Sequence, residues 1–369
     1  MLFSRLKNFD STLFVLMVLL IIIGLSIQYS LSLSQVNFKS SNFVKQSIFA
    51  VSGLILFFII TCLDFRFIKA INLVFYILVV LLLLGVLIFG QVSHGVKGWF
   101  NLGFFNFQPI ELAKLAALLA LAQFWGFSRQ PIRVNHIIVS FIIILPLLFL
   151  IMRQPDFGSA MMIVILWFGL LLMMDRNKKH ILGLLLMIIL IGALGWSFFL
   201  KDYQQDRILT YLNPQSDQAG RGYQITQSTI AVGSGQIFGR GFGLGTQSQL
   251  RFLPASETDF IFAALTEEFG LLGSILLLGF YVALISRLVK IAKSAYDNFS
   301  QIFVLGAVIY FFSQAIINIG MNIGLFPIVG IPLPFISYGG SSLLVSMLIL
   351  AIIESILLYQ PFTHTPEQK

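Results

Sequence analysis

The sequence has few charged residues and almost no cysteine. Of its 369 residues, 10% are charged and 58% are hydrophobic, whereas soluble domains contain about 25% charged residues. So few charges could not cover a soluble core of this size, which excludes a globular cytosolic protein. The single cysteine, Cys62, cannot form an intramolecular disulfide. The four histidines are scattered along the chain, so a Cys/His metal site is not indicated.

Motifs for binding nucleotides or nucleic acids are also missing. The Gly-rich stretch within 201–258 does not have the G-x-x-x-x-G-K-[ST] order of a P-loop. No basic run is longer than the pair Lys178–Lys179, and a net charge of +8 is typical of a membrane protein that keeps Lys and Arg in its cytoplasmic loops. We therefore expect no organic cofactor and no nucleic-acid partner.

Long apolar runs are abundant instead. A transmembrane helix needs about 20 mostly apolar residues. The candidate runs lie at about 12–33, 45–62, 70–92, 109–127, 136–152, 158–174, 181–200, 259–285, 300–321 and 341–359. Lys and Arg are concentrated in the short loops on the N-terminal side, which the positive-inside rule assigns to the cytoplasm. The sequence therefore predicts an all-α polytopic membrane protein with about ten transmembrane helices and both termini cytoplasmic.

One loop, at 201–258, is much longer and more polar than the others. It lies between the seventh and eighth predicted spans, which places it on the extracytoplasmic side. Loops of more than about 12–15 residues are usually functional or disordered. A flexible linker is the simple interpretation, but "YQITQSTIAVGSG" has the apolar spacing of a short amphipathic helix. We treat residues 1–369 as a single transmembrane domain that contains this loop.

Ionisable residues inside apolar spans are costly and are therefore candidates for function. Glu111 and Lys114 lie three residues apart in the fourth span, so they share a helix face and can pair. This pair is either a buried structural clamp or part of a functional site. Asp156, in "RQPDFGS" between the fifth and sixth spans, is most simply the cap of the following helix.

More acidic residues occur in "SETDFIFAALTEEFG", where the long loop meets the eighth span. The Asp259 carboxylate is expected to be partly buried and yet reachable from outside, an environment that suits a general base. The alternative is that Thr258 or Asp259 caps the helix, and the two roles are compatible. Glu267, eight residues further on, falls on roughly the same helix face and is expected to line the same cavity.

Two segments rich in glycine, proline or aromatic residues interrupt the helical pattern. "GLFPIVGIPLPFISYGGSS" at 324–342 cannot be a regular helix, and non-helical backbone at membrane depth persists only where it lines a cavity or is buried in protein. "HGVKGWFNLGFFNFQP" at 94–109 is typical of an amphipathic interfacial segment. The residues together indicate a transporter or an intramembrane enzyme that acts on a lipid-linked substrate.

Five segments of the chain resemble known signatures: "KGWFNLGFFNFQPIELAKL", "QPDFGSA", "GRGYQITQSTIAVGSG", "GTQSQLRFLPASETDFIFAALTEEFG" and "GIPLPFISYGGSS". They are similar to those of the SEDS family (shape, elongation, division, sporulation), the RodA and FtsW proteins of bacterial cell-wall synthesis. The resemblance runs from the first span to the last. "GTQSQL" and the short cytoplasmic tails are more similar to the RodA branch of the family.

The resemblance implies a peptidoglycan glycosyltransferase that polymerises lipid II at the outer face of the plasma membrane during cell elongation, with inversion of the donor linkage. The family's essential aspartate falls on Asp259, which would accept the proton of the attacking sugar hydroxyl. The residues expected to bind substrate come from the motifs and the long loop: Lys97, Trp99, Gln108, Arg207, Arg221, Gln224, Ser228, Gln247, Glu257 and Ser337.

The chain departs from the family pattern in places. Gly98 and Ile110 stand where Arg and Ser are usual, and Arg251 replaces a frequent acidic residue. Glu257 occupies the position of a common His, two residues before Asp259. This second carboxylate would raise the pKa of the aspartate or help to bind a divalent cation.

Positive charge at the pyrophosphate leaving group would come from Arg207, Arg221 or Lys97, or from a Mg²⁺ or Mn²⁺ ion. The implied partner is a class B penicillin-binding protein, which crosslinks the strands, with other membrane proteins of the elongation complex. The implied location is the bacterial plasma (inner) membrane. A lipid II flippase or other transporter, a division polymerase of the FtsW type and a scaffold are the alternative hypotheses.

Overall fold

The computed structural model describes residues 8–33, 42–93, 96–101, 103, 106–128, 132–174, 183, 210–211, 217 and 220–360. Within these residues, nine helices are long and apolar enough to cross a membrane. They are α2 (Ser11–Ser32), α3 (Asn42–Cys62), α5 (Asn72–Phe89), α6 (Pro109–Phe127), α7 (Val134–Arg153), α8 (Phe157–Met174), α13 (Ile261–Lys293), α14 (Asn298–Asn322) and α15 (Gly340–Tyr359). They confirm nine of the predicted spans. The remaining run, 181–200, lies almost wholly outside the described residues.

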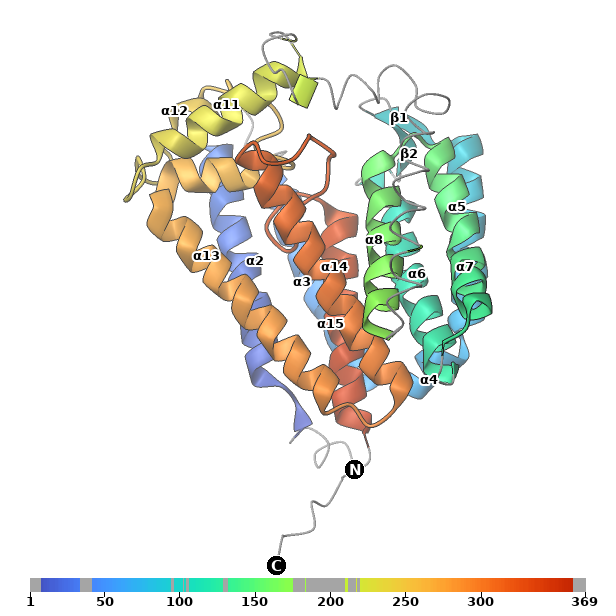
Figure 1. The fold of residues 1–369 in the computed structure, drawn as a ribbon. Helices are drawn as coiled ribbons and strands as arrows, with labels where there is room; N and C mark the ends of the chain where they lie inside the picture. Colours follow the sequence, from blue (N-terminus) through green and yellow to red (C-terminus); the bar gives the residue numbers. More distant parts are fainter. Residues whose placement is uncertain are drawn as a thin grey trace, which may run out of the picture.

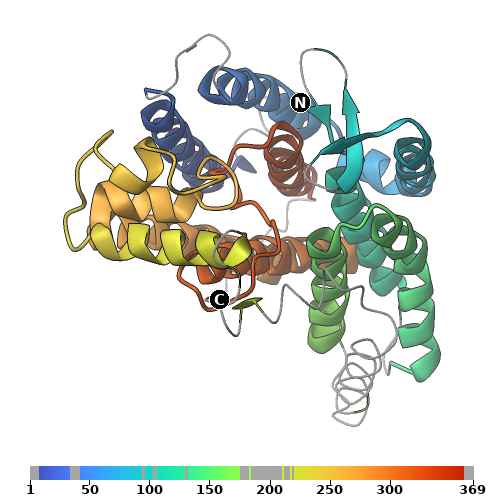
Figure 2. The same ribbon diagram turned by 90° about the horizontal axis from the view of Figure 1, so that it is seen from above.

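The helices α14 and α15 lie in the middle of the bundle (Figures 1 and 2). Most of each span is buried in the protein, 72% for α14 and 78% for α15, against 22% for α3 and α5. The outer helices expose apolar side chains, such as Leu73 and Ile88 of α5, which are each 69% exposed. Apolar surfaces of this extent are stable against lipid chains rather than water, so these faces are the lipid-contacting surface of the bundle.

The short elements α11 (Arg221–Ser234) and α12 (Thr246–Gln249) lie at the top of the bundle in Figure 1, together with a small sheet. The helix α4 (Phe65–Ala70) and the start of α2 lie at the bottom. The amphipathic helix predicted in the long loop is thus confirmed as α11. The top of Figure 1 is the end that the sequence assigns to the extracytoplasmic side.

The segment predicted as interfacial at 94–109 contributes two of the three strands of the small sheet. It consists of β1 (Gln91–Ser93), β2 (Val96–Asn101) and β3 (Asn106–Phe107), which pair antiparallel in the order β1-β2-β3. Aromatic residues favour strands, and Phe100 of β2 pairs with Phe107 of β3. The strand β2 packs on α5 and α6, so the sheet covers the extracytoplasmic ends of these two helices.

A break in α13 separates the predicted eighth span into two helical pieces. Gly270 has φ 66° and ψ −162°, which is outside the helical region. A Cβ atom at this position would lie 2.3 Å from Gly239 N and 2.5 Å from Ile237 O, so only glycine fits. The loop after α11 is hydrogen-bonded to the backbone at this break, where Leu271 N donates to Gln236 O at 2.9 Å. The predicted eighth span is thus present, and the structure adds a break at Gly270 that the sequence analysis did not predict.

The segment between α14 and α15 is non-helical, as its proline and glycine content predicted. It is packed inside the protein at this end, since Ile331, Leu333 and Ile336 are each at most 2% exposed. Its buried position places it against the residues just before α13, where the candidate site lies.

Candidate functional site

Residues 257–259 immediately precede α13, and each of their three carbonyl groups accepts a hydrogen bond from elsewhere in the bundle. The carbonyl of Glu257 accepts from the Gln28 side chain of α2 and from the Tyr338 backbone N–H, both at 2.8 Å. The carbonyl of Thr258 accepts from the Ser337 hydroxyl at 2.6 Å. The backbone of this short segment is therefore fixed by α2 and by the segment between α14 and α15.

Two buried asparagines on α14 hold the third carbonyl, that of Asp259. Asn318 and Asn322 are one helical turn apart and fully buried, and their side-chain amides donate to Asp259 O at 3.1 and 2.9 Å. Asn318 also donates to Ile331 O at 2.8 Å, and Asn322 accepts from Ala263 N at 2.9 Å. One pair of side chains thus joins the carboxylate-bearing segment, the start of α13 and the loop before α15.

The Asp259 carboxylate lies beside Gly330, a position that favours glycine because of its backbone conformation. Gly330 has φ 72°, and a Cβ atom there would sit 3.7 Å from Asp259 Oδ2. Asp259 is half-buried, and the neighbouring Glu257 carboxylate accepts a hydrogen bond from Asn42 of α3. Burial raises the pKa of the Tyr338 phenol, and the charge of Glu257 raises it further, so this phenol stays protonated. The site therefore presents two carboxylates on a rigid backbone at the extracytoplasmic end.

The helix-cap interpretation of Thr258 and Asp259 is wrong. The first residue of α13 is Ile261, and its N-cap residue is Phe260, whose side chain makes no cap hydrogen bond. The hydroxyl of Thr258 instead donates to Ala255 O at 3.3 Å. The backbone of Asp259 is held by the hydrogen bonds that its own carbonyl accepts from α14.

Glu267 does not line the same cavity as Asp259, contrary to the prediction. Its side chain is fully buried and caps α12, accepting from Gln247 N at 2.8 Å and from Ser248 N at 3.0 Å. The Ser248 hydroxyl donates to the same carboxylate at 2.8 Å. Gln247, a predicted substrate residue, therefore uses its backbone N–H to anchor α12 on the first part of α13.

Some of the predicted substrate residues belong to α11, which contacts α14 beside the site. Ser228 is fully buried, and its hydroxyl donates to Asn322 O at 2.7 Å, so it supports the asparagine that holds Asp259. Gln224 is half-buried on the same helix. Arg221 begins α11, but its side chain lies outside the described part of the chain, as does all of Arg207.

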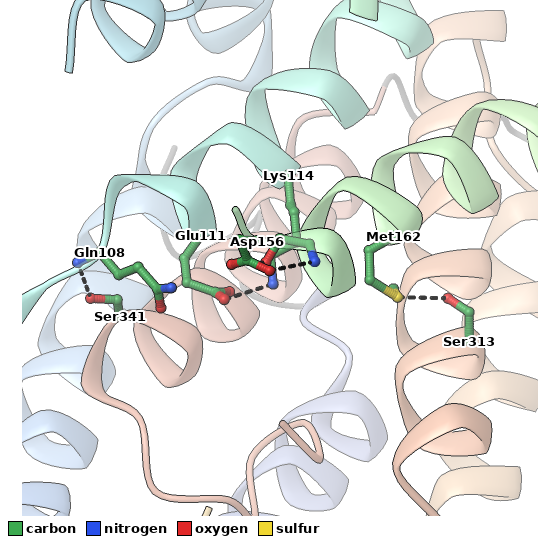
Figure 3. Close-up of polar contacts among 8 residues, drawn as sticks. Gln108, Glu111, Lys114, Asp156, Met162, Ser313 and Ser341 are labelled. Carbon is green, nitrogen blue, oxygen red and sulfur yellow. Dashed lines mark hydrogen bonds and ion pairs between the residues drawn. The ribbon is translucent and has the colours of Figure 1, made fainter. Parts of the chain in front are cut away.

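Lys97, Trp99 and Gln108 form a separate group around the sheet. Lys97 Nζ donates to Ile88 O at the end of α5, at 3.2 Å. Trp99 pairs with Gln91 across β1 and β2. The backbone N–H of Gln108 donates to the Ser341 hydroxyl of α15 at 3.1 Å (Figure 3). These residues share the extracytoplasmic end with residues 257–259 but are positioned by α5, α6 and α15.

Glu111 and Lys114 form the predicted buried ion pair, with Lys114 Nζ 2.6 Å from Glu111 Oε1 (Figure 3). Lys114 Nζ also lies 5.9 Å from the ring centroid of Tyr310 on α14. Asp156 caps α8, as predicted, accepting from Ser159 N at 2.9 Å and from the Ser159 hydroxyl at 2.8 Å. The Asp156 charge also attracts Lys114, so the pair and the cap belong to one polar cluster.

The sequence reasoning missed the asparagines and glutamines that hold the site. Neutral amides inside spans carry no charge and so were not among the predicted site residues. The signal was present, because "NIGMN" places Asn318 and Asn322 four residues apart in an apolar helix. An amide buried in a membrane span needs hydrogen-bond partners, and a backbone carbonyl before a helix is a suitable one.

The fold and the site together define a multi-pass membrane protein with a rigidly held carboxylate segment at one end. The chain belongs to the family of FtsW, RodA and SpoVE proteins, whose model, described as "Cell cycle protein", matches residues 10–361. It is 39% identical to the peptidoglycan glycosyltransferase MrdB of Escherichia coli (strain K12) over 281 residues, which cover 76% of each chain.

Solved structures agree with this membership. A chain of a peptidoglycan synthase complex that coordinates polymerization and crosslinking matches with a TM-score of 0.81 and 29% identity, covering 96% of this chain and 99% of that one. The rod shape determining protein RodA of Thermus thermophilus matches with a TM-score of 0.71 and 27% identity, covering 96% and 98%. The predicted SEDS family, polytopic helical fold and peptidoglycan glycosyltransferase activity are confirmed.

Proposed function

We propose that the protein polymerises lipid II into glycan strands at the outer face of the plasma membrane during cell elongation, with Asp259 as the general base. The observation that carries this assignment is the fixation of all three carbonyls of residues 257–259 by partly buried hydrogen bonds. A general base must be held within hydrogen-bond reach of the proton that it accepts. A carboxylate on a backbone fixed in this way meets that requirement.

The proposed reaction is attack of the GlcNAc 4-hydroxyl of one chain on the MurNAc anomeric carbon of another. Asp259 accepts the hydroxyl proton as the new bond forms, a contribution of ~10²–10⁴-fold in rate. The pyrophosphate leaves from the opposite face, so a single displacement inverts the linkage. Pyrophosphate leaves without a general acid but needs positive charge nearby. Lys97, Arg207 and Arg221 are the proposed sources of that charge.

A divalent cation is a further proposal for the pyrophosphate. Within the described part of the chain, no three His, Cys, Asp or Glu side chains come together as ligands. These residues therefore do not form a protein cage for an ion. Magnesium is commonly held by one or two carboxylates together with substrate phosphates, and Glu257 with Asp259 are the carboxylates in question. We assign no step of the reaction to the ion.

The proposed partner is a class B penicillin-binding protein that crosslinks the new strands, within the elongation complex. The solved synthase complex described above supports this proposal, because one of its chains matches this protein over 96% of its length. The protein is a multi-pass membrane protein, and the plasma (inner) membrane of a bacterium is its proposed location. The site would then face the outer side, where the crosslinking domain of the partner works.

The experiment that tests the function is polymerisation of labelled lipid II by the purified protein with its partner. Asp259→Asn keeps the shape of the side chain but cannot accept the proton, and we expect it to lose ~10²–10⁴-fold in rate. The matched control is Asp64→Asn at the other end of the bundle, where Asp64 accepts from Arg66 N at 2.9 Å. The control should polymerise normally. Near-normal polymer from Asp259→Asn would refute the general base, and lipid II crossing vesicles without polymer would favour a flippase.

A further inference from the structure

A cavity of about 850 Å³ lies between α5, α6 and α7. It is lined by the start of α5, the end of α6 and the first half of α7, which places it at the end of the bundle opposite α11 (Figure 1). Its volume is in the range of ~300–1,000 Å³ that is typical of small-molecule sites. Because Asp259 lies at the other end, the proposed reaction makes no use of this cavity.

The walls of the cavity are apolar and open toward the membrane. Leu73 of α5, Ile142 of α7 and Phe127 of α6 line it and are 69%, 55% and 71% exposed. Side chains of this kind on the outside of a membrane bundle contact lipid chains. The Tyr76 hydroxyl donates to Ile143 O at 2.5 Å and holds α5 to α7 beside the cavity. An acyl chain can therefore enter from the bilayer and lie along a fixed wall.

A pair of amides lies among these apolar residues. Asn72 is 4% exposed, and its Nδ2 donates to Gln123 Oε1 at 2.5 Å. The Oδ1 atom of Asn72 is buried and has no hydrogen-bond partner in the described part of the chain. A buried polar atom without a partner costs free energy. Because Oδ1 is an acceptor, it would be satisfied by a ligand that brings a hydroxyl or another hydrogen-bond donor to this depth.

Two cationic side chains lie at the mouth of the cavity, and one of them is paired with Asp297. Lys69 Nζ lies 5.3 Å from the ring centroid of Phe127, a lining residue. It also forms an ion pair with Asp297 Oδ2 at 3.7 Å. Arg133, at the start of α7, is exposed, and its backbone N–H donates to Nδ1 of the lining residue His136 at 3.0 Å. Cationic side chains at the cytoplasmic surface attract anionic lipids, at about 1 kcal/mol for each charge, or roughly five-fold in affinity.

We propose that this cavity binds one anionic phospholipid of the cytoplasmic leaflet. An acyl chain lies along Leu73 and Ile142, a hydroxyl of the lipid headgroup donates to Asn72 Oδ1, and the phosphate lies near Arg133. A transmembrane helix of another protein suits the cavity less well. Such a helix is about 10–12 Å wide, and its backbone groups are already bonded internally, so it would leave the amide pair unsatisfied.

The test is native mass spectrometry of the delipidated protein, titrated with phosphatidylglycerol or with phosphatidylethanolamine of the same chains. We expect one phosphatidylglycerol per protein, bound more tightly than phosphatidylethanolamine. Arg133→Gln, an exposed change that leaves the core intact, should weaken phosphatidylglycerol binding about five-fold. Ala120→Phe, which fills the cavity, should abolish binding. The matched control Leu276→Phe, on the lipid-facing side of α13 and 59% exposed, should bind as the unchanged protein does.

Three results would overturn the proposal. Equal binding of the two lipids would remove the anionic preference, and unchanged binding by Ala120→Phe would place the lipid elsewhere. If Leu276→Phe lost as much phosphatidylglycerol binding as Ala120→Phe, the lipids would coat the bundle without a specific site. A photocrosslinker at Leu73 should label lipid in membranes. If it captured a helix of the partner protein instead, the cavity would be a protein-docking site.

Discussion

Replacing Lys114 by methionine should destabilise the protein more than replacing both members of the ion pair. Lys114 Nζ lies 2.6 Å from Glu111 Oε1, and the side chains are only 3% and 4% exposed. At an effective dielectric constant of about 20, the attraction at this distance is ~6 kcal/mol. The other carboxylate oxygen, Glu111 Oε2, is buried without a partner in the described part of the chain, so without Lys114 the charge has no compensation.

Breaking one side of a buried pair costs ~3–5 kcal/mol, whereas replacing both partners by apolar or neutral groups is often nearly neutral. At ~2–4 °C per kcal/mol, Lys114→Met should lower Tm by roughly 6–20 °C. The assay is thermal unfolding of the detergent-solubilised variants. Glu111→Gln combined with Lys114→Met should recover most of the loss, and Lys293→Met, at an exposed lysine, is the matched control. A double variant no more stable than Lys114→Met would refute the clamp.

Three further predictions concern the site and its sidedness. Asn322→Leu should slow polymerisation and leave the affinity for lipid II similar, because the hydrogen bonds of Asn322 position the backbone of Asp259. Unchanged rates would contradict this role. Glu267→Gln should weaken the anchoring of α12 by about 1–3 kcal/mol, seen as faster proteolysis of this loop; wild-type resistance would contradict it. In a cysteine-free background, a Cys at Leu250 should react with an impermeant maleimide in intact spheroplasts, and one at Tyr296 only after permeabilisation; the reverse pattern would invert the topology.

Much of the architecture was predictable because the bilayer restricts what a chain can do. Spans need about 20 apolar residues with all backbone groups bonded internally, so the spans could be located from composition alone. Local spacing was equally informative where both partners lie on one helix. Glu111 and Lys114 pair because three residues bring them to one face, and Asp156 caps α8 from the position that a cap requires.

The tertiary structure decided what depends on distant parts of the chain. Glu267 was predicted beside Asp259 from an eight-residue helical spacing, but Asp259 precedes the helix, so that spacing does not apply. Glu267 instead binds the N-terminus of α12. The site backbone is held by Gln28 and Asn322, which lie 229 and 63 residues from their partners. Sequence periodicity determines which face of a helix a residue occupies, whereas only the packed bundle determines which group stands opposite that face.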